Sequence, residues 1–270
     1  MAAARADLSL LMLIAITRAV SPALNRCELG YLPRQEIDLA KAEAQHRIYE
    51  DCLRELGAWV VSLAPEPDLP DSMFVEDPAV VVKEVAVMTR MGAASRRAES
   101  ESFAPALACF RPLRWMREPA TLEGGDVMPV GSTLFVGISE RTNRAGIEQL
   151  AEELRPFGYT VKPVAVRGCL HLKSGCSALG GQTILASPDW VDASAFEGFD
   201  VVSVAPGEAR AANVLALGDT VLMPAGFPGT ACVLERLGRN VRALDISELT
   251  KAEAGVTCSS ILLEGELPAA

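Results

Sequence analysis

Short apolar strands recur in pairs along this chain, and a two-residue turn joins the two strands of each pair. The pairs occupy residues 79–88, 127–136, 177–185 and 213–223. Gly180-Gly181 and Gly218-Asp219 suit tight hairpin turns because these residues tolerate positive φ, whereas Lys83-Glu84 is a poorer turn pair. The pattern predicts a strand–turn–strand unit that the chain uses several times.

A helical pattern and then a further strand follow most of these hairpins. In the second unit, Ile147, Leu150 and Leu154 fall on one face at helical spacing. The expected pairs of helix and strand are 145–154 with 161–166, 190–196 with 201–204, and 231–237 with 241–246. These three units are therefore each predicted to contain two strands, a helix and a third strand.

A fifth unit is predicted to be divided between the two ends of the chain. Its strands are Ser260–Leu263, the apolar run Leu10–Ile16 and Trp59–Leu63, and its helix is Asp38–Leu56. The apolar run is too short to span a bilayer and lacks the charged lead-in of a signal peptide, so we interpret it as a buried strand. No Ser- or Pro-rich linker divides the chain. We therefore expect one closed domain over residues 1–270, and two independent domains are the alternative.

Composition narrows the class of protein. Half of the 270 residues are hydrophobic and 22% are charged, which is typical of a soluble globular protein. The net charge of −10 argues against nucleic acid or an anionic membrane as the main partner and mildly favours a cationic ligand. Seven cysteines, an odd number without CxxC spacing, indicate a reducing compartment and hence a cytoplasmic location.

Residues that can carry chemistry lie just before the first strand of each unit. They are Glu76-Asp77, Glu123, His171, the Ala212-Asn213 junction and Cys258. From Glu76 to Glu123 is 47 residues, from Glu123 to His171 is 48, and from His171 to Cys258 is 87, about two units. Equivalent positions in a ring of repeats converge on its axis. Carboxylate, imidazole and thiol would then meet as charge stabiliser, proton shuttle and nucleophile.

Each of these residues also has a plainer interpretation. Cys258 is equally well an inert buried thiol. His46 lies in a charged helix and is interpreted as a solvated surface residue, which leaves His171 for proton transfer. Cys169, His171 and Cys176 match no common zinc spacing, so we expect no metal.

The remaining candidates are ambiguous in the same way. Gly124-Gly125-Asp126 is also a suitable strand-entry turn. Arg96-Arg97 and Arg141 are also compatible with ordinary surface charge near helix starts.

Six motifs together resemble the dimethylarginine dimethylaminohydrolase family. They are DSMFVED at 71–77, TRMGAASRR at 89–97, LEGGD at 122–126, SERTN at 139–143, HLKS at 171–174 and TCS at 257–259. Residues 38–46 also resemble that family. The likeness covers nearly the whole chain in order. It differs at Met91, where many members have Pro, and at Glu123, which is Asp in some.

The resemblance implies a five-bladed α/β propeller of ββαβ units, the pentein fold. It also implies hydrolysis of asymmetric dimethylarginine or monomethylarginine to citrulline and a methylamine, without metal or organic cofactor. Cys258 would be the nucleophile and His171 the general acid and base, with Glu123 and Asp77 binding the guanidinium. The other implied substrate contacts are Arg96 and Arg141 on the carboxylate, Asp71 and Glu76 lining the pocket, Leu29 from a mobile lid, and the backbone near Ala252.

Three other functions remain open. Arginine deiminases and amidinotransferases share the implied fold, but their chains are usually longer and carry inserted segments. A binding protein that retains the pocket without the chemistry is the third, and the presence of Cys258, His171 and Glu123 argues against it. The expected partner is a small methylated arginine, and the expected assembly is a monomer or homodimer.

Overall fold

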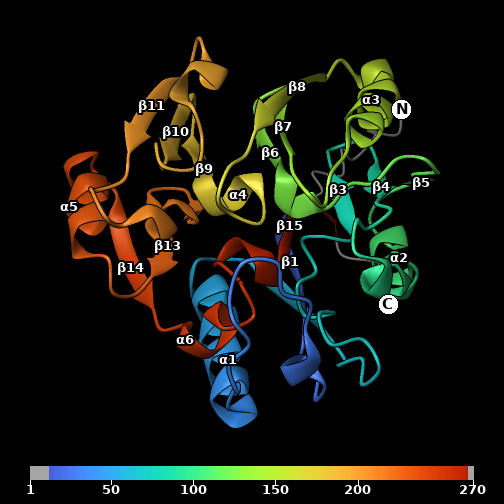
Figure 1. Cartoon of the computed structure of the whole chain (residues 1–270), viewed down its shortest axis with the longest axis horizontal. Coiled ribbons are helices and arrows are strands. Elements are labelled where there is room, and N and C mark those ends of the chain that lie inside the picture. Colours follow the sequence, from blue (N-terminus) through green and yellow to red (C-terminus); the bar gives the residue numbers. More distant parts are fainter. Residues whose placement is uncertain (1–11, 267–270) are drawn as a thin grey trace, which may run out of the picture.

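The chain folds into five separate three-stranded sheets arranged around a common centre, as Figure 1 shows. The structure, a computed structural model, describes residues 12–266. In every sheet the central strand pairs antiparallel with one neighbour and parallel with the other. The five-bladed propeller of ββαβ units is therefore confirmed.

The five blades are composed of consecutive elements, except that the last uses both ends of the described chain. The first three blades are β3 (Ala79–Val81), β4 (Ala86–Met88), α2 (Ala98–Ala108) and β5 (Leu113–Trp115); β6 (Val127–Val130), β7 (Thr133–Ile138), α3 (Arg144–Leu154) and β8 (Thr160–Ala165); and β9 (Cys176–Gly180), β10 (Thr183–Ala186) and β11 (Asp200–Ser203). The last two are β12 (Leu215–Leu217), β13 (Thr220–Pro224), α5 (Pro228–Arg236) and β14 (Asn240–Leu244); and β15 (Ile261–Gly265), β1 (Met12–Arg18), α1 (Leu39–Glu55) and β2 (Trp59–Leu63). Two short helices, α4 (Leu172–Gly175) and α6 (Ser247–Thr250), lie between blades.

The fifth sheet joins the two ends of the described chain. Strand β1 pairs antiparallel with β15, with Met12 opposite Gly265, and parallel with β2. Residues 10 and 11 of the predicted apolar strand lie outside the described residues. Helix α1 begins where Asp38 accepts a hydrogen bond from the Lys41 N–H over 3.0 Å, a typical N-cap.

Apolar side chains fill the spaces between neighbouring blades. Phe135 of β7 meets Phe196 edge to face at a centroid distance of 4.9 Å, and meets Phe199 at 5.1 Å. The long helices α1, α2, α3 and α5 lie on the outside of the ring in Figure 1, while the short α4 lies near its centre. The packing leaves the turns that precede each first strand near the centre. No helix within residues 12–266 is long and apolar enough to cross a membrane.

Two segments differ from the pattern-based expectation. Helix α2 and strand β5 were not predicted, because α2 contains Pro105 and only a weak apolar stripe around Phe103 and Leu107. In the third blade the expected helix is reduced to a 3-10 turn, Ala193–Phe196. Both segments depend on packing against their own sheet rather than on local periodicity.

The prediction that His46 is a solvated surface residue is wrong. His46 is only 3% exposed, and its Nε2 lies 3.4 Å from Oε1 of the buried Glu50. The same Glu50 oxygen accepts a hydrogen bond from Thr17 of β1 over 2.6 Å. The charged face of α1 is therefore turned partly toward the sheet, and a buried polar cluster forms where the residue pattern indicated solvent.

Candidate active site

The candidate residues lie at equivalent positions in their blades and meet at the centre of the ring. Asp77 precedes β3, Glu123 precedes the 3-10 turn that leads into β6, and His171 is the N-cap of α4 ahead of β9. Cys258 lies in the 3-10 turn Thr257–Ser259 ahead of β15. The predicted convergence of carboxylate, imidazole and thiol is therefore what the fold produces.

Two glycines are needed for this convergence. A Cβ atom added to Gly125 would lie 2.6 Å from Nδ1 of His171 and 2.7 Å from Oδ1 of Asp77. One added to Gly124 would lie 2.0 Å from the carbonyl oxygen of Glu76. Any side chain at either position would displace the neighbours. The two glycines thus do more than open a strand, because they let the polar groups approach one another.

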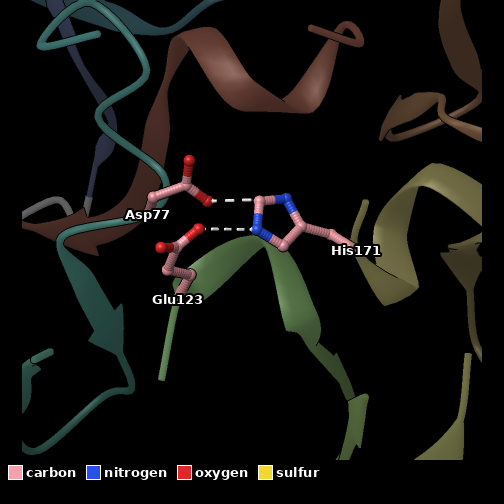
Figure 2. Close-up of side chains that lie close together, drawn as sticks. All are labelled: Asp77, Glu123 and His171. Atoms are coloured by element: carbon pink, nitrogen blue, oxygen red, sulfur yellow. Dashed lines mark hydrogen bonds and ion pairs between the residues drawn. The ribbon is translucent and has the colours of Figure 1, made fainter. Parts of the chain in front are cut away.

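The ring of His171 faces two carboxylates, which lie on the same side of it in Figure 2. Its Nε2 lies 2.8 Å from Oε2 of Glu123, and its Nδ1 lies 4.0 Å from Oδ1 of Asp77. Burial alone would lower the pKa of His171, but the charge of Asp77, the hydrogen bond to Glu123 and the charge of Asp126 together raise it to about 9. The imidazole is therefore cationic at neutral pH.

Glu123 lies behind His171 and is fully buried. Burial would raise its pKa, but the hydrogen bond and charge of His171, with the charges of Arg96 and Arg141, lower that pKa well below its ordinary value. The N–H groups of Gly92 and Ala93 also donate to Oε1 of Glu123, over 3.1 and 3.3 Å. Since its oxygens are occupied, Glu123 faces His171 and the two arginines rather than the cavity.

The two candidate arginines are buried, so the surface interpretation does not apply. Nη1 of Arg96 lies 2.9 Å from Oδ2 of Asp77. The other side of the same guanidinium makes two hydrogen bonds to Glu99, of 3.0 and 2.8 Å. Nη1 of Arg141 lies 3.3 Å from Oε1 of Glu123. Each arginine lines the central cavity while it neutralises carboxylates beside it.

Cys258 is partly exposed in the wall of that cavity. Its Sγ accepts a hydrogen bond from the Gly255 N–H over 3.4 Å. Burial, followed by the charges of Glu76 and Asp77, raises the pKa of the Cys258 thiol above its ordinary value, against smaller opposing effects of the Gly255 N–H and Lys173. The thiol is therefore neutral in the empty site at pH 7, which differs from a resting thiolate–imidazolium pair.

Other polar residues complete the wall. Lys173 forms a 2.7 Å ion pair with Oε1 of Glu76, and Thr257 donates to Oε2 of the same carboxylate over 2.9 Å. Both oxygens of Asp71 accept the Glu28 N–H, over 3.2 and 3.0 Å. Burial raises the pKa of both Asp71 and Glu76. The cavity thus has a dense but largely paired set of charges.

Of the predicted substrate contacts Ala252 and Leu29, only Ala252 lines the catalytic cavity. Leu29 packs against the apolar cluster beside Cys258, and within the described chain it is Glu28 that reaches the cavity wall.

Three residues were missed by sequence reasoning, namely Lys173, Glu99 and Glu253. Lys173 lies within the HLKS motif, which was a usable signal. The other two are recognisable only from their contacts.

Asp77, Glu123 and His171 also place one ligand atom each within 4.8 Å of one another, so this group has the spacing of a metal site. Arg96 and Arg141 already neutralise the two carboxylates. Both ring nitrogens of a protonated His171 are donors, and a metal ligand must be an acceptor. The charges present therefore disfavour a cation at this position.

Comparison with known proteins places this geometry in a family. The family model described as arginine deiminase matches residues 65–171. The dimethylarginine dimethylaminohydrolase of Streptomyces coelicolor is 39% identical over 251 residues, which cover 92% of this chain and 96% of the relative. That of Pseudomonas aeruginosa is 36% identical over 226 residues, covering 83% and 89%. The chain belongs to the dimethylarginine dimethylaminohydrolase family.

A solved structure from this dimethylarginine dimethylaminohydrolase family has the same fold throughout. It is a cysteine-to-serine variant of the Pseudomonas aeruginosa protein in complex with citrulline, and it superposes with a TM-score of 0.88 at 32% identity. The superposition covers 94% of this chain and 100% of that one. The resemblance inferred from the six motifs is thereby confirmed.

Proposed function

We propose that the protein hydrolyses asymmetric dimethylarginine or monomethylarginine to L-citrulline and dimethylamine or methylamine. The observation that carries the proposal is the single cavity lined by Cys258, His171 and Asp77, with Glu123 directly behind the imidazole. Membership of the dimethylarginine dimethylaminohydrolase family supports it. The citrulline in the related structure is the product this reaction would give.

The acidic wall suits a planar cationic guanidinium. Asp71, Glu76 and Asp77 line the cavity, and carboxylates can hold guanidinium N–H groups in pairs that fix the plane of the carbon. Arg96 and Arg141 lie in the same wall and are assigned to the substrate carboxylate. The backbone near Ala252 and the Leu29 segment are assigned to the amino-acid end of the substrate.

Attack begins when Cys258, beside the bound cation, releases its proton to solvent water, because His171 is already protonated. The thiolate forms a C–S bond to the guanidinium carbon and gives a tetrahedral adduct. The bond from carbon to the methylated nitrogen then breaks. His171, protonated in the resting site, donates its proton so that the amine leaves neutral.

The second half-reaction reverses the direction of the proton. Neutral His171 accepts a proton from a water molecule that attacks the same carbon. The C–S bond breaks as the carbon–oxygen double bond forms, and the hydroxyl proton of the adduct returns to the sulfur, which releases citrulline and restores the thiol. Glu123 holds the imidazole in one orientation and stabilises its charged form through both steps, as an acid–base group requires.

The decisive experiment is to incubate the protein with asymmetric dimethylarginine, monomethylarginine and arginine in parallel and to quantify citrulline. Citrulline from the methylated substrates, absent with Cys258→Ser, supports the proposal. Citrulline from arginine in preference to both would instead indicate an arginine deiminase, the function named by the matching family model. No citrulline from any of them, together with measurable binding, would indicate a non-catalytic guanidino-ligand-binding protein.

We also propose a cytoplasmic location and a monomeric or homodimeric assembly. All seven cysteines lie within residues 12–266 and all are free, which supports a reducing compartment. Analytical ultracentrifugation measures the assembly directly.

A further inference from the structure

A short loop with no helix or strand contributes to the wall of the catalytic cavity. We define residues 28–32 as the lid segment. Glu28 lines the catalytic cavity, and Tyr31 and Leu32 line a neighbouring cavity of about 380 Å³. The lid segment therefore forms part of the wall of both cavities.

One carboxylate holds the lid segment in place. Oε2 of Glu253 accepts the Gly30 N–H over 2.9 Å, and Oε1 accepts the Tyr31 N–H over 2.6 Å. Oε1 also accepts the N–H of Leu32. Three consecutive backbone donors thus converge on a single anion, and hydrogen bonds to a charged acceptor are stronger than those to a neutral one.

The backbone of Glu253 is unusual in a way that points to the same role. With φ of 62°, it is the one non-glycine residue in the left-handed region among residues 12–266. A residue with a Cβ is disfavoured there, and such strain persists where the surroundings hold it. The three lid N–H groups provide that constraint.

Glu253 also connects the lid to the nucleophile. It lies in the same loop as Gly255, whose N–H donates to Sγ of Cys258, and its side chain lines both cavities. At the other end of the lid, the Glu28 N–H is bound by Asp71, which lines the catalytic cavity. The lid segment is therefore fixed at both ends by carboxylates that face the site.

The lid must move if a substrate is to enter. With the lid held as described, the catalytic cavity has about 20 Å³ of free space, little more than the roughly 10–15 Å³ that a cavity needs to hold one water molecule. A molecule the size of arginine does not fit. The hydrogen bonds to Glu253 would therefore break and form again in each catalytic cycle.

We propose that Glu253 is a positioning residue that latches the lid segment over the catalytic cavity, and that its carboxylate sets how fast methylated arginines enter and leave. The proposal rests on the proposed function for its substrate. The latch itself rests only on the contacts of Glu253.

Hydrogen exchange at the lid amides tests the latch without any ligand. Glu253→Gly removes the carboxylate and also suits the positive φ, so the backbone of the loop is not further strained. We expect exchange of the Gly30, Tyr31 and Leu32 amides to speed up at least about tenfold, the factor for losing one charge-assisted hydrogen bond. Unchanged protection of these amides would overturn the proposal.

The chain offers a matched control. The Glu208 carboxylate likewise accepts two consecutive backbone N–H groups, those of Gly229 at 3.0 Å and Thr230 at 2.6 Å, and Glu208 does not line the catalytic cavity. Glu208→Gln should leave lid exchange unchanged. Glu253→Gln keeps the length of the side chain but loses its charge, so its lid exchange should fall between wild type and Glu253→Gly.

Ligand kinetics test the role in positioning. In the Cys258→Ser background, stopped-flow dissociation of monomethylarginine should be about tenfold faster with Glu253→Gly than without it, for the same energetic reason. An unchanged dissociation rate would overturn the positioning role. If wild-type protein forms no citrulline and Cys258→Ser binds no methylarginine, the proposed function fails, while the exchange experiment still decides whether the latch exists.

Discussion

The backbone N–H of Glu76 donates a hydrogen bond to the carbonyl oxygen of Cys258 over 3.3 Å. This bond holds the nucleophile loop against the acidic segment that precedes β3. The carboxylates of Glu76 and Asp77 consequently lie near enough to the sulfur to raise its pKa. The same contact that positions the thiol for attack therefore opposes its ionisation in the empty site.

We predict that near neutral pH Cys258 ionises only when a cation binds beside it. Burial and the neighbouring carboxylates raise the pKa of Cys258. An unperturbed thiol has a pKa of about 8.5, so the rate of alkylation by a neutral reagent should keep rising above that pH. Cationic amidine reagents should inactivate faster than neutral reagents of equal reactivity. Cys258→Ser provides the background labelling of the other thiols. A titration midpoint well below pH 7 would contradict this and favour a pre-formed thiolate–imidazolium pair.

Cys258→Ser should retain fold and substrate binding but lose turnover. A hydroxyl is far less acidic than a thiol, so the bound cation cannot generate an equivalent nucleophile. Calorimetric binding of methylarginine and a citrulline assay measure the two properties. A covalent adduct of the wild type that maps to Cys169 or Cys176 would remove Cys258 from its role. Both of those thiols are buried, and their pKa values are raised mainly by burial, that of Cys169 to about 12.

The two arginines should respond differently to removal. Arg141→Ala should raise KM for methylarginine with a smaller effect on single-turnover chemistry, because a charge-assisted pair with the substrate carboxylate is worth about 1.5–3 kcal/mol. Steady-state and single-turnover assays separate these effects. An unchanged KM would show that the carboxylate docks elsewhere.

Arg96→Ala should in addition destabilise the fold. Its removal leaves the buried carboxylates of Asp77 and Glu99 without their cation, and breaking a buried pair typically costs about 3–5 kcal/mol. Urea unfolding of Arg96→Ala beside Arg141→Ala checks the difference. Equal stability of the two variants would show that the pairs of Arg96 are dispensable.

Stability should fall as pH rises through the alkaline range because of His171. Its pKa is raised from 6.5 to about 9 in the folded protein, so its contribution is fully present below about pH 6.5 and is lost as pH rises through 9. At 1.36 kcal/mol per unit, this is on the order of 3 kcal/mol. Urea unfolding from pH 6 to pH 10 measures it. His171→Gln should flatten this dependence, and an equally steep fall in that variant would assign the effect to other groups.

The repeat explains why so much of this architecture could be predicted. Two-residue turns such as Gly218-Asp219 mark the hairpins locally, and spacings of 47 and 48 residues bring Glu76, Glu123 and His171 to equivalent positions. Contacts between side chains far apart in sequence have no such local signal. The burial of His46 depends on how α1 rests on β1, and the role of Glu253 depends on a lid 223 residues earlier in the chain.

The pairing of Met12 with Gly265 has a topological consequence. The break in the ring falls between the first and second strands of a blade, where the other four blades have a hairpin turn. Linking the two ends and cutting the chain at the exposed Gly131–Ser132 turn would transfer that same break from β15 and β1 to β6 and β7. Such a circular permutant keeps every strand pair, so its urea midpoint should stay close to that of the parent. The stability of the ring would then not depend on which blade contains the chain ends.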